Sequence, residues 1–296
     1  MPSLKEVKNR INSVSSTQQI TKAMKMVAAA KLRKSQDRIG QMRPFAQKLA
    51  FILQNLSAAQ SDGEGDNWYS LAREEKKILI VAVSSDRGLC GSFNSSIFKG
   101  VSRLIEEKYK EQQESGNVTV LPIGRKALDF FTKRNVHVIA NYAGLFSNLS
   151  FGRVSEAAEF MMKAFREGKF DKVVVVYNEF KNVATQILRA EQLLPVVPPK
   201  IDGSKLSNQI DYIYQPNKEE IMEGLIPKSL KVQLFKAVLD SNASENGARM
   251  TAMDKATENA GELLKQLRLT YNRTRQAAIT KEILEIVGGA EALKSA

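Results

Sequence analysis

Two long stretches without proline most restrict what this chain can fold into. The chain has eight prolines, at positions 2, 44, 122, 195, 198, 199, 216 and 227. Residues 3–43 and 228–296 contain none. Since an internal proline removes a helical hydrogen bond and clashes with the preceding turn, either stretch can run as one helix. At about 1.5 Å per residue the second would span about 100 Å, so it must project beyond an ordinary core.

Apolar spacing predicts that these end helices pair. Apolar side chains recur at alternating intervals of three and four residues, as in a coiled-coil seam. The predicted seams comprise Met42, Phe45, Leu49, Ile52 and Leu56; Met253, Ala256, Ala260, Leu263 and Leu267; and Leu4, Val7, Ile11 and Val14. Gln18 and Thr21 then break the register of the last seam, and the polar segment SDGEGDN (61–67) ends the first arm. We expect residues 1–60 and 217–296 to form a coiled-coil shaft.

The middle of the chain has a different pattern, with runs rich in Val and Ile that are typical of strands. These runs are KKILIVAVSS (76–85), VTVLPIG (118–124), VHVIANY (136–142) and FDKVVVVYNEF (170–180). Helical patterns lie between them, and strands that alternate with helices predict a mainly parallel sheet. ATQILRAEQLLPV (184–196) is expected to add an antiparallel strand.

The predicted fold class is therefore α/β plus a long antiparallel α-helical coiled coil. A Rossmann-like, mainly parallel sheet domain at residues 74–216 is inserted between the N- and C-terminal helices. No stretch reaches the roughly 20 uncharged apolar residues that span a membrane, and MPSLKEVKNR lacks the apolar run of a secretory signal.

The excess of positive over negative charge is confined to the two ends of the chain. The net charge is +12, from 44 Lys and Arg against 32 Asp and Glu. Residues 1–58 hold 11 basic and 2 acidic side chains, residues 59–227 hold 22 of each, and residues 228–296 hold 11 and 8. Charge gathered on one part of a fold indicates an acidic or polyanionic partner.

The segment ITKAMKMVAAAKL (20–32) carries that charge in an unusual form. It combines an alanine-rich, apolar body with Lys22, Lys25 and Lys31 and contains no acidic residue. A core helix would not carry lysines at scattered angles, and a solvated helix would not expose so many apolar side chains. Something outside this helix must cover it.

The segment SSDRGLCGSFN (84–94) is a candidate phosphate site, because it follows the first strand and opens a helix. It has only Gly88 and Gly91, without the glycine spacing of a dinucleotide fold or the Lys-Ser/Thr ending of a P-loop. The alternative is a tight strand-to-helix turn that displays Asp86, Arg87 and Cys90. An α/β nucleotide enzyme using residues 84–94 stays open as a minor reading.

Soft ligands and nucleophiles are scarce. Cys90 is the single cysteine and His137 the single histidine, so the chain has no internal disulfide and too few ligands for zinc. Catalysis by Cys90 would need His137 as its base, and a lone pair of this kind is more often structural. We expect no catalytic residue, metal or cofactor.

Two further partners remain open for the basic arms. Helices with Lys and Arg could bind nucleic acid through phosphates, although the stacking aromatics of single-strand binders are missing. A membrane-surface helix is less favoured, because large apolar residues do not gather on one face opposite the lysines.

Four segments closely resemble the gamma subunit of F-type ATP synthases. They are ITKAMKMVAAAKLRKSQ (20–36), SSDRGLCGSFN (84–94), ARMTAMDKATENA (248–260) and YNRTRQAAITKEILEIVGGAEA (271–292). The resemblance implies a coiled-coil shaft inside a hexamer of three alpha and three beta subunits. Such a rotor couples ion-driven rotation of the c ring to the conformational cycle of the catalytic beta subunits, and regulates ATPase activity and ion flow. The rotor itself would hold no catalytic residue.

Contacts carry over where the motifs match. Met24, in TKAM, and Arg275, Gln276, Thr280 and Glu282, in RQAAITKE, would face the beta subunits. Arg87 and Cys90, in SDRGLCG, would lie near the lower lip of the hexamer. Tyr212 and Tyr214, in DYIYQP, would meet the c ring and the epsilon subunit.

The resemblance also implies a cellular place. The partners would be alpha, beta, epsilon and the c ring, with no nucleic acid, and membrane association would be indirect, through the membrane sector. The chain lacks the cysteine-bearing insertion of the chloroplast form, and it begins with Met1 at the shaft helix. These features favour a bacterial protein or a processed mitochondrial one. Of the two we expect a bacterial protein, at the cytoplasmic face of the inner membrane.

Overall fold

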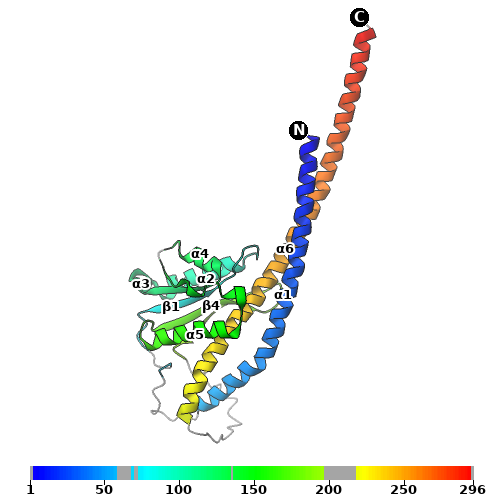
Figure 1. Cartoon of the computed structure of the whole chain (residues 1–296). Coiled ribbons are helices and arrows are strands. Elements are labelled where there is room, and N and C mark those ends of the chain that lie inside the picture. Colours follow the sequence, from blue (N-terminus) through cyan, green and yellow to red (C-terminus); the bar gives the residue numbers. More distant parts are fainter. Residues whose placement is uncertain (1–2, 59–67, 70–72, 135, 197–217, 295–296) are drawn as a thin grey trace. The chain divides into compact units, whose positions relative to one another are not determined.

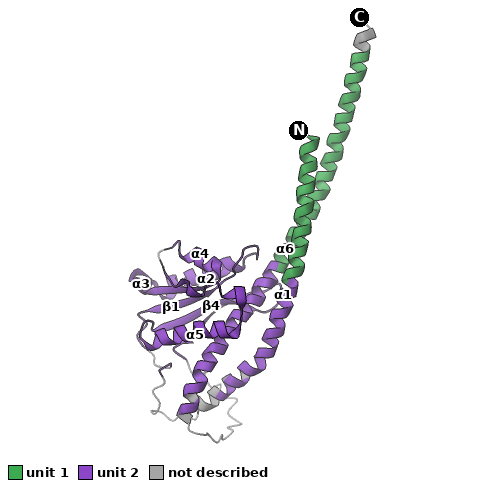
Figure 2. Ribbon diagram, in the orientation of Figure 1, with its two compact units in different colours: residues 1–28, 250–296 green, residues 29–249 purple. Residues whose placement is uncertain are grey.

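Long helices form both ends of the chain, and an α/β region lies between them in the sequence. The computed structural model describes residues 3–58, 68–69, 73–134, 136–196 and 218–294 (Figure 1). It divides into two compact units, Met1–Ala28 with Met250–Ala296 (unit 1) and Ala29–Arg249 (unit 2), as Figure 2 shows.

The two end helices are longer than the proline-free stretches. Helix α1 spans Leu4–Ala58 and contains Pro44; helix α6 spans Lys218–Lys294 and contains Pro227. A proline inside a helix costs about 3 kcal/mol, whereas burying one large aliphatic side chain gains about 1.5–3 kcal/mol. Ile226 and Leu230 flank Pro227 and are both buried. Packing on the core therefore compensates for the proline in α6.

A five-stranded sheet forms the centre of the described part of unit 2, in the order β3-β2-β1-β4-β5. Strands β1 (Ile78–Val83), β2 (Val118–Ile123), β3 (His137–Val138) and β4 (Lys172–Phe180) are parallel. Strand β5 (Gln186–Leu194) is antiparallel to β4, as the sequence predicts. The expected strand at 136–142 is only two residues long and leads into two 3-10 turns, η1 (Ala140–Tyr142) and η2 (Leu145–Asn148).

Helices cover both faces of this sheet. Helices α2 (Phe93–Lys108) and α4 (Arg125–Phe131) pack on one face, and the short α3 (Lys110–Glu114) follows α2. Helix α5 (Phe151–Arg166) and the first half of α6 pack on the other face. Strands β1 and β2 are buried along their full length, which explains why they are almost wholly apolar.

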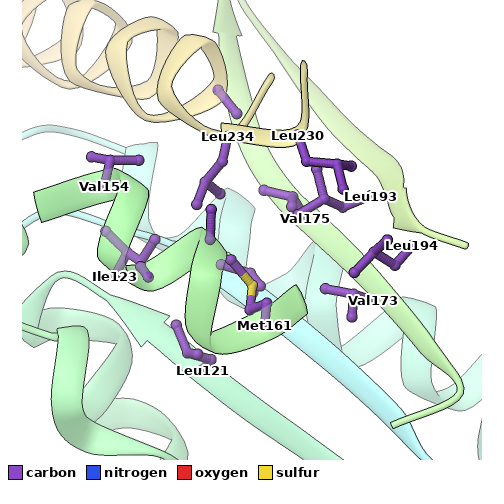
Figure 3. Packing of buried hydrophobic residues seen from close by; sticks show 14 of the residues in the cluster. Leu121, Ile123, Val154, Met161, Val173, Val175, Leu193, Leu194, Leu230 and Leu234 are labelled. Atoms are coloured by element: carbon purple, nitrogen blue, oxygen red, sulfur yellow. The ribbon is translucent and has the colours of Figure 1, made fainter. Parts of the chain in front are cut away.

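The larger core lies between the sheet, α5 and α6. Val154 and Met161 of α5 point toward Leu121, Ile123 and the β4 valines, while Leu230 and Leu234 of α6 meet Val175 and Leu193 (Figure 3). The apolar stripe of α6 that includes Leu230 and Leu234 therefore belongs to the core of unit 2.

Helix α5 has an N-cap residue, Ser150, whose side-chain oxygen accepts a hydrogen bond from the Arg153 amide.

In unit 1, α1 and α6 pair in antiparallel fashion, but their seam differs from the predicted one. Thr21 is buried against Thr257, so polar residues continue the α1 register and do not break it. On α6, Leu264 is buried, whereas the predicted seam residue Leu263 is 44% exposed. Apolar spacing alone selected the wrong neighbour, because two adjacent leucines both fit a three-four pattern.

These observations confirm the predicted fold class, an α/β sheet region together with a long antiparallel helical pair. The seam predicted for α1 is partly wrong, because Phe45 is 58% exposed although Leu49 is buried. The domain limits 1–60, 74–216 and 217–296 stay a prediction; the compact units divide each long helix between them.

The contact of α6 with the core gives a first test. We expect Leu234→Ala to lower the free energy of unfolding of unit 2 by about 2–5 kcal/mol, since Leu234 is fully buried. Denaturant titration followed by circular dichroism measures this loss. Leu269→Ala, on the same helix at a residue 60% exposed, is the control and should change stability by less than about 0.5 kcal/mol. Equal losses would contradict the packing of α6.

Candidate functional site

The turn after β1 is built by a network of short polar bonds. The Ser84 hydroxyl accepts a hydrogen bond from the Ala127 amide at 2.8 Å, which ties the turn to α4. Asn94, in the first turn of α2, accepts a bond from the Ser85 amide at 3.0 Å. Leu89 has a φ of +63°, a left-handed conformation uncommon outside glycine. The chain therefore reverses tightly here and presents the Arg87 and Leu89 side chains outward.

Cys90 does not have the position expected from the sequence. The turn was predicted to display it, but its side chain is only 1% exposed and packs in the core beneath α2. Burial raises the pKa of its thiol, although the bond with Ser85 and the charge of Arg249 oppose this. A buried thiol of raised pKa is structural and unreactive.

Helix α6 crosses the carboxyl ends of β1 and β4. The Ser241 hydroxyl donates to the Val83 carbonyl at 3.3 Å, and the Ser244 hydroxyl donates to the Asn178 carbonyl at 2.9 Å. Both serines are fully buried. Small side chains allow this close approach, and they recur along α6 at Ala237, Ser241, Ser244 and Ala248.

This crossing fills the place where open α/β sheets bind ligands. The sheet order reverses between β1 and β4, and the crevice outside the strand ends at such a reversal is the usual nucleotide site. Here the chain's own helix occupies it with hydroxyls that bond to backbone carbonyls. The nucleotide reading of residues 84–94 is therefore not supported by the structure.

Arg249 forms an ion pair with Glu245 within α6 and also bonds to the turn. The Arg249 guanidinium donates to Glu245 at 2.6 Å, and to the carbonyls of Arg87 and Gly88 at 3.2 and 3.3 Å. Burial raises the pKa of Glu245, while the Arg249 charge opposes that shift. The pair fixes the turn backbone and leaves the Arg87 side chain exposed.

The predicted contact residues of unit 1 lie on exposed helix surface. Arg275, Gln276, Thr280 and Glu282 are all exposed on α6, and Met24 on α1 is half-buried. Pairing Thr21 with Thr257 places the start of α1 beside about residue 274 of α6. Residues 275–290 lie beyond that point, and Figure 1 shows α6 running past the start of α1. Met24 and the Arg275 group are thus separate along unit 1.

The end of α6 is apolar on several sides. Ile283, Leu284 and Ile286 are 54%, 64% and 71% exposed, and they occupy different angles around the helix. An exposed apolar surface of this kind marks a contact with another molecule.

Comparison with known proteins decides the family. A family model described as ATP synthase matches residues 3–293. The ATP synthase gamma chain of Cytophaga hutchinsonii is 60% identical over 296 residues, which is the full length of both chains. That of Flavobacterium psychrophilum is 53% identical over 294 residues, 99% of this chain and all of that one.

The chain belongs to the ATP synthase gamma chain family. None of the relatives described above supports the alternative of a basic coiled-coil protein that binds nucleic acid.

Solved structures agree with the family. A chain of the Tetrahymena thermophila mitochondrial ATP synthase, from its central stalk and c-ring, is 26% identical with a TM-score of 0.54. It is matched over 99% of its length and 80% of this chain. A Euglena gracilis mitochondrial ATP synthase chain has a TM-score of 0.68 at 21% identity, over 94% of its length and 98% of this one. The second likeness supports the fold alone.

Cys90 and His137 do not form a catalytic pair. Cys90 follows the carboxyl end of β1, whereas His137 pairs with Thr119 near the start of β2. The two residues therefore lie at opposite ends of a parallel sheet, and His137 is exposed at its edge.

The remaining sequence predictions concern the foot of the stalk, metal binding and membrane crossing. Tyr212 and Tyr214 fall in 197–217, which the structure does not describe. Within the described ranges no cluster of three metal-ligating side chains occurs. None of the helices described is both long and apolar enough to cross a membrane.

Sequence patterns did not identify the α6 residues that build the site, Ser241, Ser244, Glu245 and Arg249. One signal was present: small residues recur every three or four positions from Ala237 to Ala248, which indicates close helix packing. The surface that they meet is formed by strands about 65 to 160 residues earlier. Helical periodicity cannot identify such a distant partner.

A buried carboxylate lies nearby on α6. Asp240 is 6% exposed, and burial raises its pKa from 3.8 to about 6; Lys236 and Arg43 oppose that shift, and Glu179 and Glu191 add to it. Tyr177 donates to Glu191 at 2.9 Å. Compared with the unfolded chain, the folded state therefore favours the protonated form of Asp240.

This shift predicts a pH dependence of stability. Because the folded state holds the Asp240 proton more tightly than the unfolded chain, the contribution of Asp240 to stability is fully present below about pH 4 and is lost as pH rises through about 6. Asp240→Asn should raise the free energy of unfolding at pH 7.5 by up to about 3 kcal/mol and remove this component of the pH profile.

Denaturant titrations between pH 4 and 8 measure both effects. Asp129→Asn, at a side chain 61% exposed, is the matched control and should leave the profile unchanged. A variant Asp240→Asn that is less stable than wild type at pH 7.5 would show that the charged form is the favoured one.

Proposed function

We propose that this chain is the central-stalk rotor of a bacterial F-type ATP synthase. The observation that carries the proposal is end-to-end similarity to gamma chains, at 60% identity to that of Cytophaga hutchinsonii. The antiparallel pair of α1 and α6 in unit 1 supports it, because this pair can act as a shaft.

The mechanism is mechanical. Ion flow turns the c ring, and the ring turns the gamma chain within a hexamer of three alpha and three beta subunits. The shaft is asymmetric, so its interaction free energy differs among the conformations of the beta subunits. Rotation passes this preference from one beta subunit to the next and so drives the release of ATP. The catalytic sites would lie on the beta subunits, and this chain would hold none.

The proposed contact residues are those whose motifs match the gamma family, and their exposure supports the proposal. Met24 and the exposed group Arg275, Gln276, Thr280 and Glu282 would face the beta subunits. Arg87 would reach the lower lip of the hexamer from the turn that Arg249 fixes. Cys90 would act only through the shape of this turn, since its thiol is buried.

The cationic surface would complement acidic loops of the beta subunits. Exposed Lys22 and the exposed apolar side chains of Ile20, Met26 and Val27 lie on one short segment of α1. Such a surface suits surrounding subunits that offer both carboxylates and apolar contacts. Tyr212 and Tyr214 would meet the c ring and the epsilon subunit, at the cytoplasmic face of the inner membrane.

Co-expression with the alpha and beta subunits of the same bacterium tests the proposal. We expect one copy of this chain with three alpha and three beta subunits, and ATP hydrolysis that depends on it. Native mass spectrometry and an ATPase assay measure these two results. A chain that stays alone while alpha and beta assemble without it would refute the rotor function.

Charge at the end of α6 gives a separate prediction. We expect Arg273→Ala with Arg275→Ala to weaken assembly by about 10- to 100-fold, because both exposed cations would lose carboxylate partners. Leu267→Ala, at a half-buried residue, should cost no more than this.

Titration of labelled alpha and beta subunits with the variants measures the affinity. Lys99→Ala removes a charge from an exposed residue of α2 and is the control for net charge alone. Full tolerance of both arginine substitutions would contradict the proposed contact.

A further inference from the structure

The seam between α1 and α6 in unit 1 contains a polar layer where apolar residues would be more stable. The hydroxyls of Thr21 and Thr257 lie 2.8 Å apart across the seam, and each also lies within hydrogen-bond distance of a carbonyl of its own helix. Since each hydroxyl has one proton, one of them donates across the seam and the other donates to its own carbonyl. The Gln18 amide donates to the Thr257 carbonyl at 3.4 Å. Thr21 is buried, and Gln18 and Thr257 are half-buried, so these three side chains lie in the seam.

An ion pair continues the layer by one turn. Lys25 donates to Asp254 at 2.6 Å, with side chains 40% and 59% exposed. On the other side of the layer, Gly261 lies against Gln18, where an added Cβ would stand 3.0 Å from the amide nitrogen. Five polar side chains and one glycine thus fit together in a single register.

These partners exist only in that register. A slip by one heptad would place Thr21 beside Leu264 or Met250, and Lys25 would lose Asp254. Polar residues in a coiled-coil seam reduce stability but select one register and orientation, because the alternatives leave them unpaired. Small and apolar residues on either side, such as Ala28 and Ala260, would not discriminate as sharply.

We infer that the layer formed by Gln18, Thr21, Lys25, Asp254 and Thr257 is a positioning device that fixes the register of the two shaft helices. This inference rests on the proposed rotor function. A slip of one heptad moves one helix by about 10 Å along the other. Such a slip would displace the α6 end relative to Met24 and would dissipate torque that the shaft should transmit.

Disulfide trapping in the assembled enzyme reports the register directly. Pairing Thr21 with Thr257 pairs Val14 with Leu264 and Val7 with Tyr271. Cysteines at 14 and 264, or at 7 and 271, therefore report the native register. Cysteines at 14 and 271, or at 7 and 264, report slips in the two directions. Cys90 is buried and does not compete.

The test variant is Thr21→Val with Thr257→Val, which keeps the shape and removes both hydroxyls. We expect the thermal stability of the chain to be unchanged or higher, since two paired polar groups become apolar together. Slipped disulfides should increase at least threefold, and ion pumping per ATP hydrolysed should fall at least threefold. A merely structural layer would not raise stability while it lowers coupling.

Two variants control the comparison. Thr17→Val with Thr270→Val removes hydroxyls that are exposed and bond only within their own helices, and it should keep the native disulfide pattern. Thr21→Ser with Thr257→Ser retains both hydroxyls and should restore coupling. It also remains informative if the valine variant does not assemble.

The outcomes separate this inference from the function on which it rests. Failure of the wild-type chain to assemble would refute the rotor proposal. Normal assembly with no additional slipped disulfides in the valine variant would overturn the register device, whatever happens to pumping. Slipped disulfides with unchanged pumping would show that register does not matter for coupling, and would overturn it too.

Discussion

The fit of α6 against the carboxyl ends of β1 and β4 is the contact on which the rest of unit 2 depends. Ser241 and Ser244 bond to the Val83 and Asn178 carbonyls, and the neighbouring Asn178 side chain bonds to the Phe93 carbonyl of α2. One helix thereby closes a sheet edge that would otherwise offer a ligand crevice. It also brings Glu245 and Arg249 under the turn at residues 84–92. A fold associated with nucleotide binding here binds one of its own helices at that position.

Much of this fold could be predicted, because the relevant signals are local. Runs of Val and Ile indicated β1, β2 and β4, and the absence of proline indicated α1 and α6. The seam was harder, since Leu263 and Leu264 both satisfy apolar spacing and only Leu264 is buried. Thr21 was read as a break because its partner, Thr257, lies 236 residues away. A polar residue in a seam is recognised only when its partner is known.

The candidate site shows the same limit. Exposure of Arg87 followed from the turn, but burial of Cys90 did not, since no local pattern distinguishes a displayed thiol from one that packs beneath α2. Arg249 would ordinarily be read as a surface cation, yet it is held by Glu245 and two turn carbonyls. Family motifs locate such residues, but only the packing explains what they contact.

The end of α6 shows why a partner is required physically. A helix that folds on its own chain hides one apolar stripe and leaves the remaining faces polar. Beyond about residue 275 the register leaves α6 without α1 beside it, and Ile283, Leu284, Ile286 and Val287 are all at least half exposed. With roughly 25 cal/mol gained per Å² of apolar surface covered, enclosure by other subunits would be strongly favourable. Other subunits that enclosed this helix would complete its core, and apolar side chains exposed on several sides would allow it to keep such contacts as it turns.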